Sequence, residues 1–436
     1  MVKYLLMGVA VAVVAAVGVA VFYSPWSPKA PSAPRGSETP SGSPHALPQG
    51  SGTASDGEWF ALPLVARSAV TPSSAPPAAS GPLPTGTPTL PNRTAASVEE
   101  TSTPTSTKPT TPTKPPTPTP TPTPTPVDFD AVRQQLQAEG KDLAHVKIGF
   151  HLGPGGNARG LGDYLTGLAD AGVPAVIKSA DAYGVCAEAL RASPNHVTVF
   201  RMSGGDLELP NYDLPPEAAA EEHWARILEA LPPEFDKRTW IEVMNEPDKE
   251  RADWLGRCSH RLAELALRDG YRFAAFGWSS GEPEPEHWRT PGIKAFLSLA
   301  AQHPDRIAVA LHEYSYSVDD IANQYPSLVG RFQALFRVCD ELGIERPTVL
   351  ITEWGWESTK VPPVEEAMED IAWASRLYGA YPKVRGAALW YLGPGYADIA
   401  DQAQRLISPL RYYAWGDYFV IEPGQAPTDP RLFAPD

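Results

Sequence analysis

The sequence predicts an α/β fold in which eight parallel strands close into a (β/α)8 barrel. Short apolar, β-branched runs alternate eight times with longer helical patterns between about residues 146 and 408. Such alternation is typical of parallel strands covered by helices. Eight strands also close a barrel that its own side chains fill, and residues 128–436 are long enough for one barrel of roughly 250 residues with insertions.

The first 23 residues form a hydrophobic segment. Tyr4–Tyr23 is a 20-residue run without charge, preceded by Lys3. It is long enough to cross a hydrocarbon core of about 30 Å. Two interpretations stay open: an uncleaved signal anchor, which the length favours, and a signal peptide cut near Gly18-Val19-Ala20. Both export the remaining chain, so we expect an extracellular protein, either secreted or anchored with its N-terminal segment in or through the membrane.

Residues 24–127 are predicted to be a disordered linker. They contain 25 of the 49 prolines, together with many Ser and Thr residues. This composition buries too little apolar surface to offset the entropy lost on ordering. Thr117–Pro126 is a strict Thr-Pro alternation, which favours extended polyproline II geometry. The segment therefore predicts a stalk that holds residues 128–436 away from a surface.

Charge and cysteine content exclude several classes of function. Residues 1–127 contain 7 Lys+Arg and 5 Asp+Glu, which leaves 29 basic and 46 acidic residues in the barrel domain. This acidic domain is not suited to nucleic acid or to an anionic membrane surface. The three cysteines, Cys186, Cys258 and Cys339, form no CxxC pair. We therefore expect neither a zinc or redox site nor a disulfide scaffold, and the sequence predicts no metal and no cofactor.

The predicted strands are apolar runs that end at polar or aromatic residues. In order they are 146–150, 174–177, 197–200, 239–247, 272–276, 307–311, 348–352 and 384–389. The fourth run, TWIEVMNEP, is rich in aromatic, β-branched and apolar residues and stops at Pro247, because proline cannot continue a sheet interior. It therefore holds Asn245 and Glu246 at a strand end.

The predicted helices separate these strands and carry recognisable end signals. They are 129–143, 161–171, 182–192, 216–231, 253–269, 291–302, 327–342, 364–378 and 398–408. Proline opens the helix at Pro216, and glycine closes others at Gly172, Gly270 and Gly343. An open doubly wound sheet is the competing fold, but it usually carries GxGxxG after the first strand, and the GPGG that follows His151 lacks that spacing. The TIM barrel is therefore the predicted fold.

Polar and aromatic residues gather at the predicted carboxyl ends of the strands, where such barrels place their active sites. They are His151, Lys178, Arg201, Asn245, Glu246, Trp278, His312, Tyr314, Glu353 and Trp390. Two buried strands that each end in a glutamate are what a two-carboxylate, sugar-cleaving site requires. Trp278, Trp354 and Trp356 fit either barrel packing or sugar binding. Glu313 alternates with its neighbours on an extended segment, so we expect it outside the site.

Residues 145–395 resemble the clan A glycoside hydrolases, a superfamily of retaining (β/α)8 enzymes. In that clan, the Glu of an Asn-Glu pair at the end of strand four is the acid/base, and a Glu at the end of strand seven is the nucleophile. The resemblance assigns these roles to Glu246, in Asn245-Glu246-Pro247, and to Glu353, in ITEWGW. It implies that Asn245 holds the sugar 2-hydroxyl.

The same resemblance implies several substrate-binding residues. His312-Glu313-Tyr314 resembles the His-x-Tyr after strand six, whose Tyr commonly contacts the nucleophile. Trp390 resembles the floor of the cleavage subsite, and Arg201 resembles the arginine that holds the nucleophile. Lys178, at the end of strand two, joins them as a candidate substrate ligand.

The implied reaction is hydrolysis of O-glycosidic bonds in poly- or oligosaccharides by double displacement. Retaining enzymes hold their two carboxyl groups roughly 5–5.5 Å apart. Glu246 should begin protonated, with its pKa raised by an apolar setting or a neighbouring charge, and ionised Glu353 should attack the anomeric carbon. Two alternatives remain: a non-catalytic carbohydrate-binding barrel and a transglycosylase that uses the same glutamates.

Overall fold

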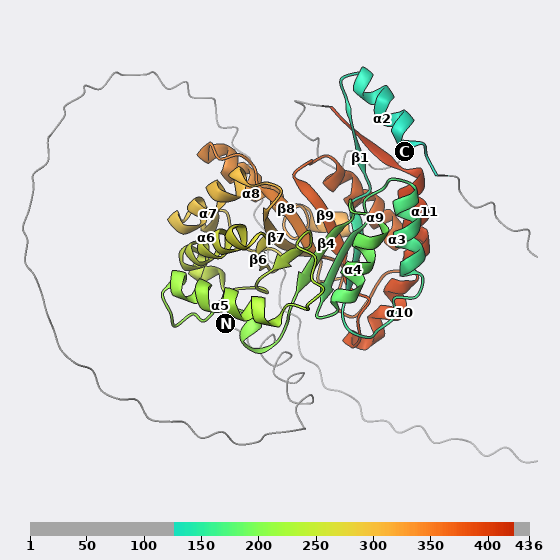
Figure 1. The fold of residues 1–436 in the computed structure, drawn as a ribbon. Helices are drawn as coiled ribbons and strands as arrows, with labels where there is room; N and C mark the ends of the chain where they lie inside the picture. Colours follow the sequence, from blue (N-terminus) through green and yellow to red (C-terminus); the bar gives the residue numbers. More distant parts are fainter. Residues whose placement is uncertain (1–125, 423–436) are drawn as a thin grey trace, which may run out of the picture. The chain divides into compact units, whose positions relative to one another are not determined.

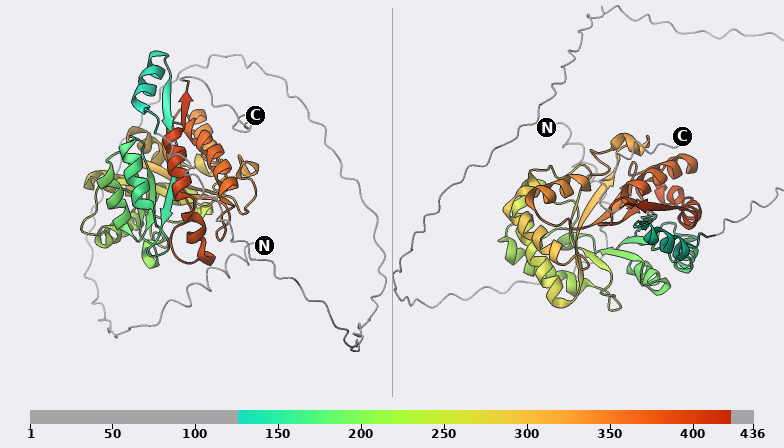
Figure 2. Two further views of the ribbon diagram at one scale, coloured as in Figure 1. Left: turned by 90° about the vertical axis from the view of Figure 1, so that its right-hand side faces the viewer. Right: turned by 90° about the horizontal axis from the view of Figure 1, so that it is seen from above.

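The computed structural model describes residues 126–422, which contain a closed barrel of eight parallel strands. The strands follow one another around the barrel in sequence order, and the first and last close it. Helices connect successive strands and lie outside them (Figures 1 and 2). The predicted (β/α)8 TIM barrel is confirmed. The predictions for the hydrophobic segment and for the linker up to residue 125 lie outside the described residues.

All eight predicted strands are present. They are β2 (Ile148–Leu152), β3 (Val176–Ala180), β4 (Val197–Arg201), β5 (Trp240–Glu242), β6 (Arg272–Trp278), β7 (Ile307–Tyr314), β8 (Thr348–Gly355) and β9 (Val384–Leu389). The fourth predicted strand is shorter than expected, because only three residues of β5 join the ladder. By contrast, β6, β7 and β8 run past their predicted ends, so Glu353 lies within its strand.

The helices between these strands agree closely with the predicted order. They are α3 (Leu161–Asp170), α4 (Tyr183–Ala192), α5 (Pro216–Ala230), α6 (Ala252–Asp269), α7 (Pro291–Gln302), α8 (Phe332–Leu342) and α9 (Val364–Gly379). Gly270 and Gly343 both cap their helices in the left-handed conformation, with φ of +83° and +66°. The predicted helix ends at Gly270 and Gly343 are therefore confirmed.

The predicted leading helix over 129–143 is wrong in its last third. Helix α2 (Phe129–Ala138) ends before Gly140, whose φ is +72°. Asp142–His145 then form strand β1, which pairs antiparallel with β10 (Tyr418–Ile421) in a separate two-stranded sheet. This strand depends on a partner from the other end of the domain, which local sequence patterns do not indicate.

Two other helices begin or divide differently from the prediction. Helix α8 begins at Phe332 rather than at 327, just after Gly330, whose φ of +85° is left-handed. The helix predicted at 398–408 is two helices, α10 (Ile399–Gln404) and α11 (Ile407–Gly416). Between them, the N–H groups of Arg405 and Leu406 bond to carbonyls three residues back instead of four, which tightens and ends the first helix.

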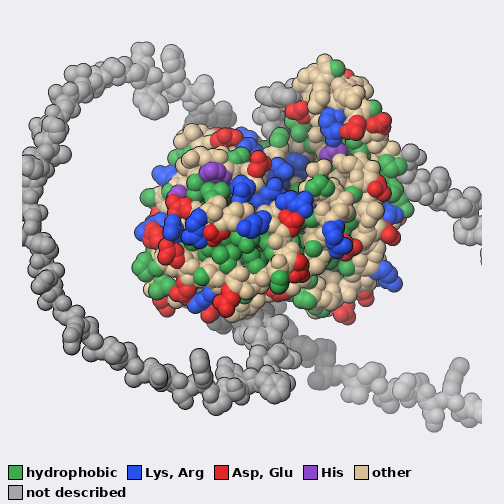
Figure 3. Space-filling view, viewed as in Figure 1, with side chains coloured by type: hydrophobic (Ala, Val, Ile, Leu, Met, Phe, Trp, Pro, Cys, Tyr) green, Lys and Arg blue, Asp and Glu red, His purple; other side chains and the backbone are tan. Residues whose placement is uncertain are grey.

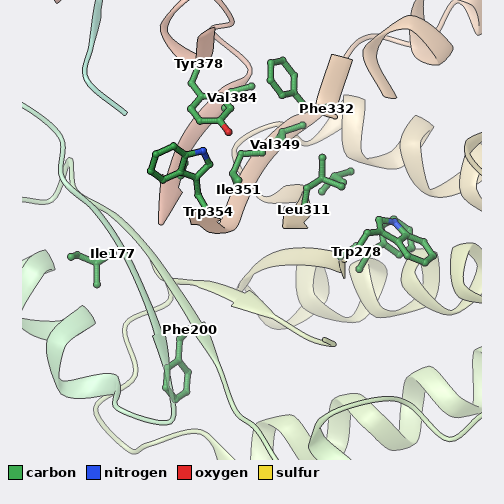
Figure 4. Packing of buried hydrophobic residues seen from close by; sticks show 14 of the residues in the cluster. Ile177, Phe200, Trp278, Leu311, Phe332, Val349, Ile351, Trp354, Tyr378 and Val384 are labelled. Carbon is green, nitrogen blue, oxygen red and sulfur yellow. The ribbon is translucent and has the colours of Figure 1, made fainter. Parts of the chain in front are cut away.

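The barrel interior contains a compact apolar layer. Its members come from six strands and are Val176, Val197, Val199, Trp240, Ala274, Ala308, Ala310 and Leu350. The alternate residues on the same strands point outward and pack under the helices, in a larger core. Figure 4 shows part of that outer core, with Leu311, Val349 and Ile351 on the adjacent strands β7 and β8. The interior side chains thus fill the barrel and support whatever lies at its carboxyl end.

The surface and the cysteines agree with a domain stabilised by its core. On the face shown in Figure 3, acidic and basic side chains are interspersed, and Lys and Arg side chains gather near its centre. Cys186, Cys258 and Cys339 are buried and unpaired. No helix among residues 126–422 has both the length and the hydrophobicity needed to cross a bilayer.

Candidate active site

A layer of buried charged side chains lies directly above the apolar layer of the barrel. Its members come from five strands and are Lys178, Arg201, Glu242, His312 and Glu353. The first four each lie two residues beyond an inward-facing residue of their own strand. Because side chains alternate along a strand, this parity directs all four into the barrel.

Glu353 enters the same layer through a β-bulge. On β7 and β8, Leu311 pairs with Ile351 but His312 pairs with Glu353, so Thr352 is an extra residue. The Thr352 hydroxyl donates to Glu242 Oε1 at 2.6 Å, and Glu353 Oε1 accepts from Lys178 Nζ at 3.1 Å. The bulge thus lets two successive residues face the interior, an arrangement common beside active sites.

A second bulge, at Gly277 on β6, positions Glu246. Phe276 pairs with Ala310 and Trp278 with Leu311, which leaves Gly277 as the extra residue. Its carbonyl accepts from the N–H of Glu246 at 2.9 Å. Gly277 has a φ of +60°, and a Cβ added there would lie 2.9 Å from Glu242 Oε1. Only glycine fits this position without displacing the carboxylate beneath it.

Glu353 is surrounded by nitrogen atoms. Besides Lys178, Arg201 Nη2 lies 3.8 Å from its Oε1, and His312 Nδ1 lies 3.6 Å from its Oε2. Its side chain is only 9% exposed. His151 Nδ1 is 3.9 Å away on the remaining side; burial, then Lys178 and Arg201, hold the pKa of His151 well below its ordinary value, so this ring is neutral. These contacts therefore hold the Glu353 carboxylate in one position.

Glu246 is more open and has two side-chain donors. Its Oε1 accepts from the Tyr314 hydroxyl at 2.8 Å and lies 3.0 Å from His312 Nδ1. The side chain is 34% exposed, and the backbone φ of +44° is left-handed, which is uncommon for a residue other than glycine and typical of functional sites. Glu246 therefore faces solvent, where a substrate would arrive.

The two predicted catalytic carboxylates lie close together. Oxygen atoms of Glu246 and Glu353, with a ring nitrogen of His312, all fall within 4.8 Å of one another. This spacing corresponds to the short carboxyl separation of retaining glycosidases, whereas inverting enzymes need roughly 6.5–9.5 Å. The same three groups could in principle ligate a metal ion, but the ammonium of Lys178 and the guanidinium of Arg201 already lie against Glu353. Those two cations would repel a metal.

Glu242 is the third carboxylate of the site and is not among the residues that the sequence pattern predicted. Its Oε2 lies 2.7 Å from Lys178 Nζ, and its Oε1 lies 3.5 Å from His312 Nε2. Burial alone would raise the pKa of Glu242, but Lys178, His312 and Arg201 hold that pKa well below its ordinary value. The parity of the strand could have indicated this residue, because Glu242 lies two residues after inward-facing Trp240.

His312 and Glu246 share one proton, and the expected raised pKa of Glu246 is wrong. Burial would lower the pKa of His312, but the charge of Glu353 and bonds to Glu242 and Glu246 raise it to about 9. Burial would raise the pKa of Glu246, but His312 and then Tyr314 lower it to about 2. In the free protein at neutral pH, the proton is therefore on His312 and Glu246 is ionised.

Lys178 and Arg201 hold the carboxylates, a role that the resemblance implies for Arg201 but that differs from the substrate binding expected of Lys178. Lys178 is fully buried between Glu242 and Glu353, so it lies beneath the site rather than facing a substrate. Arg201 is also buried, and its Nη1 lies 3.0 Å from Glu208 Oε1 at the rim. Although burial would lower the pKa of Arg201, the carboxylates of Glu242, Glu353 and Glu208 raise it.

Tyr314 has a different partner from the one that the resemblance implies. Its hydroxyl donates to Glu246, the predicted acid/base, and lies 3.0 Å from Ser279 Oγ. The resemblance implies a contact with the nucleophile, Glu353. His312, two residues earlier on β7, takes that place against Glu353, because the bulge in β8 brings these two residues into register.

Asn245 and Trp390 are available at the rim of the site. The Oδ1 of Asn245 has no hydrogen-bond partner among residues 126–422. The indole of Trp390 donates to Ser358 O at 3.3 Å, and its ring centre lies 5.0 Å from that of His151. The peptide bond from Trp390 to Tyr391 is cis. The predicted roles of both residues stay predictions.

The remaining strand-end residues serve packing. Trp278 and Trp354 are fully buried, and Trp356 is buried with its indole donating to Asp370 Oδ2 at 2.6 Å. Glu313 lies outside the site, as expected from strand alternation. It accepts from the N–H groups of Gly330 and Phe332 and from the Tyr378 hydroxyl, and burial raises its pKa to about 7.

Comparisons with known proteins assign neither a family nor a reaction to this chain. No protein-family model and no curated protein matches the chain. Among solved structures, a family 5 xyloglucanase from Paenibacillus pabuli is 12% identical with a TM-score of 0.36, covering 60% of this chain and 99% of its own. A putative fructose-1,6-biphosphate aldolase from Coccidioides immitis is 13% identical with a TM-score of 0.32, covering 62% and 91%.

A third similar structure is a glycoside hydrolase family 30 subfamily 8 xylanase from Clostridium acetobutylicum. It is 11% identical with a TM-score of 0.29, covering 57% of this chain and 65% of its own. The likeness is to barrel enzymes. Because glycoside hydrolases and aldolases both occur at this level of similarity, the comparisons do not assign a reaction, and the barrel itself rests on the strand pairing described above.

Proposed function

We propose that this chain is a retaining glycoside hydrolase acting on poly- or oligosaccharides. The observation that carries the proposal is the pair of carboxylates, Glu246 and Glu353, with oxygens within 4.8 Å at the carboxyl end of the barrel. Their environments differ as the two roles require. Glu353 is buried among cations and suits a nucleophile. Glu246 is partly exposed beside His312, which can supply a proton, and suits an acid/base.

The first chemical step forms a glycosyl ester on Glu353. Its carboxylate attacks the anomeric carbon as the glycosidic oxygen departs, and the ester carries no charge. This attack removes the negative charge that most favours the protonated form of His312. The proton on Nδ1 then moves over 3.0 Å to Glu246 Oε1 and from there to the departing oxygen. His312 is thus a positioning residue that stores the proton, and Glu246 delivers it.

The second step releases the sugar. Glu246, ionised again, removes a proton from a water molecule whose oxygen bonds to the anomeric carbon, and the ester bond to Glu353 breaks. The proton returns to the pair formed by Glu246 and His312. If another sugar hydroxyl takes the place of water, the same groups carry out transglycosylation.

The predicted export segment and stalk suit an enzyme that meets its sugar polymer outside the cell.

The test is hydrolysis of β-linked glucan, mannan and xylan panels and of aryl glycosides by the whole chain. We expect Glu353→Gln to reduce kcat by at least about 10³-fold, and Glu264→Gln, on the outer face of α6, to leave it unchanged. Glu246→Gln should keep more activity on aryl glycosides with good leaving groups, because these need little proton donation.

Azide separates the two roles. It should restore turnover in Glu353→Gly with a product of inverted anomeric configuration, and in Glu246→Ala with a product of retained configuration. No detectable hydrolysis by either wild type or Glu353→Gln would leave only carbohydrate binding. Sugar transfer to an added acceptor in place of water would establish the transglycosylase.

A further inference from the structure

Exposed large apolar side chains are concentrated at the mouth of the proposed site. Residues 126–422 contain five of them, and three follow β7 or β9 while two lie on β10. The first three are Tyr316, Val318 and Tyr396, and the other two are Tyr418 and Val420. In strand order β7 and β9 flank β8, which carries Glu353. Exposed aromatic rings on both sides of a catalytic strand need a functional explanation.

Tyr396 is connected to the nucleophile through a short chain of rings. Its ring centre lies 5.0 Å from that of Trp390 and 5.6 Å from that of Tyr391. Trp390 in turn lies against His151, whose Nδ1 is 3.9 Å from Glu353 Oε1. Partial burial, and next the charge of Glu353, raise the pKa of the Tyr396 phenol.

The backbone holds Tyr396 in this exposed position. Tyr396, Ala397 and Asp398 have φ values of +52°, +53° and +61°, three successive left-handed residues that are not glycine. Such conformations are unfavourable and persist where the surrounding structure imposes them. Tyr396 is 49% exposed despite its two aromatic neighbours. It therefore presents a fixed, open face rather than a buried contact.

Tyr316 has the corresponding place beside the acid/base. Its ring packs edge-on against Tyr314 at 5.4 Å, and its hydroxyl donates to Ser280 O at 3.4 Å. Tyr314 donates directly to Glu246. The Tyr316 ring is 53% exposed. One ring, that of Tyr314, thus lies between Tyr316 and Glu246. One ring, that of Trp390, likewise lies between Tyr396 and His151 beside Glu353.

We propose that Tyr396 and Tyr316 are stacking platforms for sugars on opposite sides of the bond that is cleaved. This inference rests on the proposed function and extends it. The sugar that becomes bonded to Glu353 continues towards Tyr396, and the sugar released with the proton from Glu246 continues towards Tyr316. The substrate is therefore a chain of several sugars held on both sides of the bond, and cleavage is internal rather than confined to a terminal sugar.

The physical basis is the match between a sugar ring and an exposed phenyl ring. The C–H face of a pyranose is apolar and flat, so stacking removes apolar surface from water, and the phenol keeps its polar end at the solvent. Because both rings are already anchored by neighbours, little side-chain entropy is lost on binding. Polar side chains at these positions would not provide such a surface.

The test measures binding and cleavage separately. Hexasaccharides of β-linked glucan, mannan and xylan are titrated against the Glu353→Gln chain, alone and combined with Tyr316→Ala, Tyr396→Ala or Tyr418→Ala. Cleavage is measured with the same tyrosine substitutions in the chain that retains Glu353. We expect roughly tenfold weaker binding and a roughly tenfold lower kcat/KM for the first two, with the loss largely in KM. Tyr418→Ala, on β10 and outside the site, should change neither binding nor kcat/KM. Tyr316→Phe and Tyr396→Phe should restore both quantities.

Substrate length gives a readout that a merely structural role would not move. On an aryl glycoside of a single sugar, which reaches neither platform, both alanine variants should lose much less activity than they lose on the hexasaccharides. Weaker hexasaccharide binding without any cleavage would support the platforms and overturn the hydrolase. Cleavage with no effect of either tyrosine would overturn the platforms and leave the hydrolase. Failure of every hexasaccharide to bind would overturn the platforms as well, as would products consisting only of single terminal sugars.

Discussion

Replacing Glu242 by Gln tests the charge balance at the floor of the site. Glu242 and Lys178 are both 0% exposed, with 2.7 Å between Oε2 and Nζ. The cations Lys178, Arg201 and His312 of the buried layer contact the carboxylates of Glu242 and Glu353 within the layer. They also contact two partly exposed carboxylates, with His312 against Glu246 and Arg201 against Glu208. Gln has nearly the same shape as Glu and can still accept the Thr352 hydroxyl, so the substitution removes charge with little change in packing.

The expected loss of stability is large because Lys178 stays buried with only one of its two carboxylate partners, Glu353. Breaking a buried ion pair from one side costs about 3–5 kcal/mol. For a domain of this size, roughly 2 °C of Tm corresponds to each kcal/mol, so Tm should fall by roughly 6–10 °C. Replacing Lys178 by Met as well removes the cation that has lost this partner. The double variant should therefore unfold at a higher temperature than Glu242→Gln alone.

The measurement is thermal and urea unfolding of residues 126–436 or the full chain, with the two single variants and the double variant in one cycle. Glu217→Gln, which breaks an exposed pair with Arg257, is the control and should change the free energy of unfolding by less than about 1 kcal/mol. If Glu242→Gln were as stable as this control, or if the two single losses simply added in the double variant, the reasoning about a buried charge layer would be refuted.

Three further predictions concern the proton and the second bulge. The rate should fall as pH rises through about 9, where His312 loses its proton, and His312→Asn should shift this alkaline limb to lower pH because Glu246 must then hold the proton itself. The folded pKa of His312 is raised from 6.5 to about 9, so protonated His312 stabilises the fold. This contribution is complete below pH 6.5 and is lost as pH rises through about 9. The free energy of unfolding of wild type and of His312→Asn across that pH range measures it. Gly277→Ala should reduce both activity and the free energy of unfolding, the latter by about 1–3 kcal/mol, because its Cβ would meet Glu242 and its φ of +60° disfavours alanine.

Matched controls keep these outcomes interpretable. His260→Asn, on the surface of α6, should leave the alkaline limb unchanged, and an unshifted limb in His312→Asn would show that the proton is stored elsewhere. Gly184→Ala, at an open position in α4 with no atom within 4 Å of the added Cβ, should be tolerated. If Gly277→Ala were equally well tolerated, the bulge would not be what positions the carboxylates.

Local rules recovered most of the fold and most of the candidate site. Glycine signals and alternation along strands depend on near neighbours, so they located eight strands and the residues that end them. The same alternation excluded Glu313 from the site, and the structure agrees. It failed for the segment around Asp142, because that strand forms only against Tyr418–Ile421 from the other end of the domain.

The sequence alone determined the barrel and the two glutamates at its carboxyl end, since strand periodicity and strand ends are written in short runs of residues. Only the tertiary structure decided where the proton beside Glu246 lies. The bulges at Gly277 and Thr352 set which residues face each other, and the carboxylates of Glu353, Glu242 and Glu246 around His312 place the proton on His312 rather than on Glu246. Register and burial depend on atoms that are distant in sequence, and electrostatic energies follow from both.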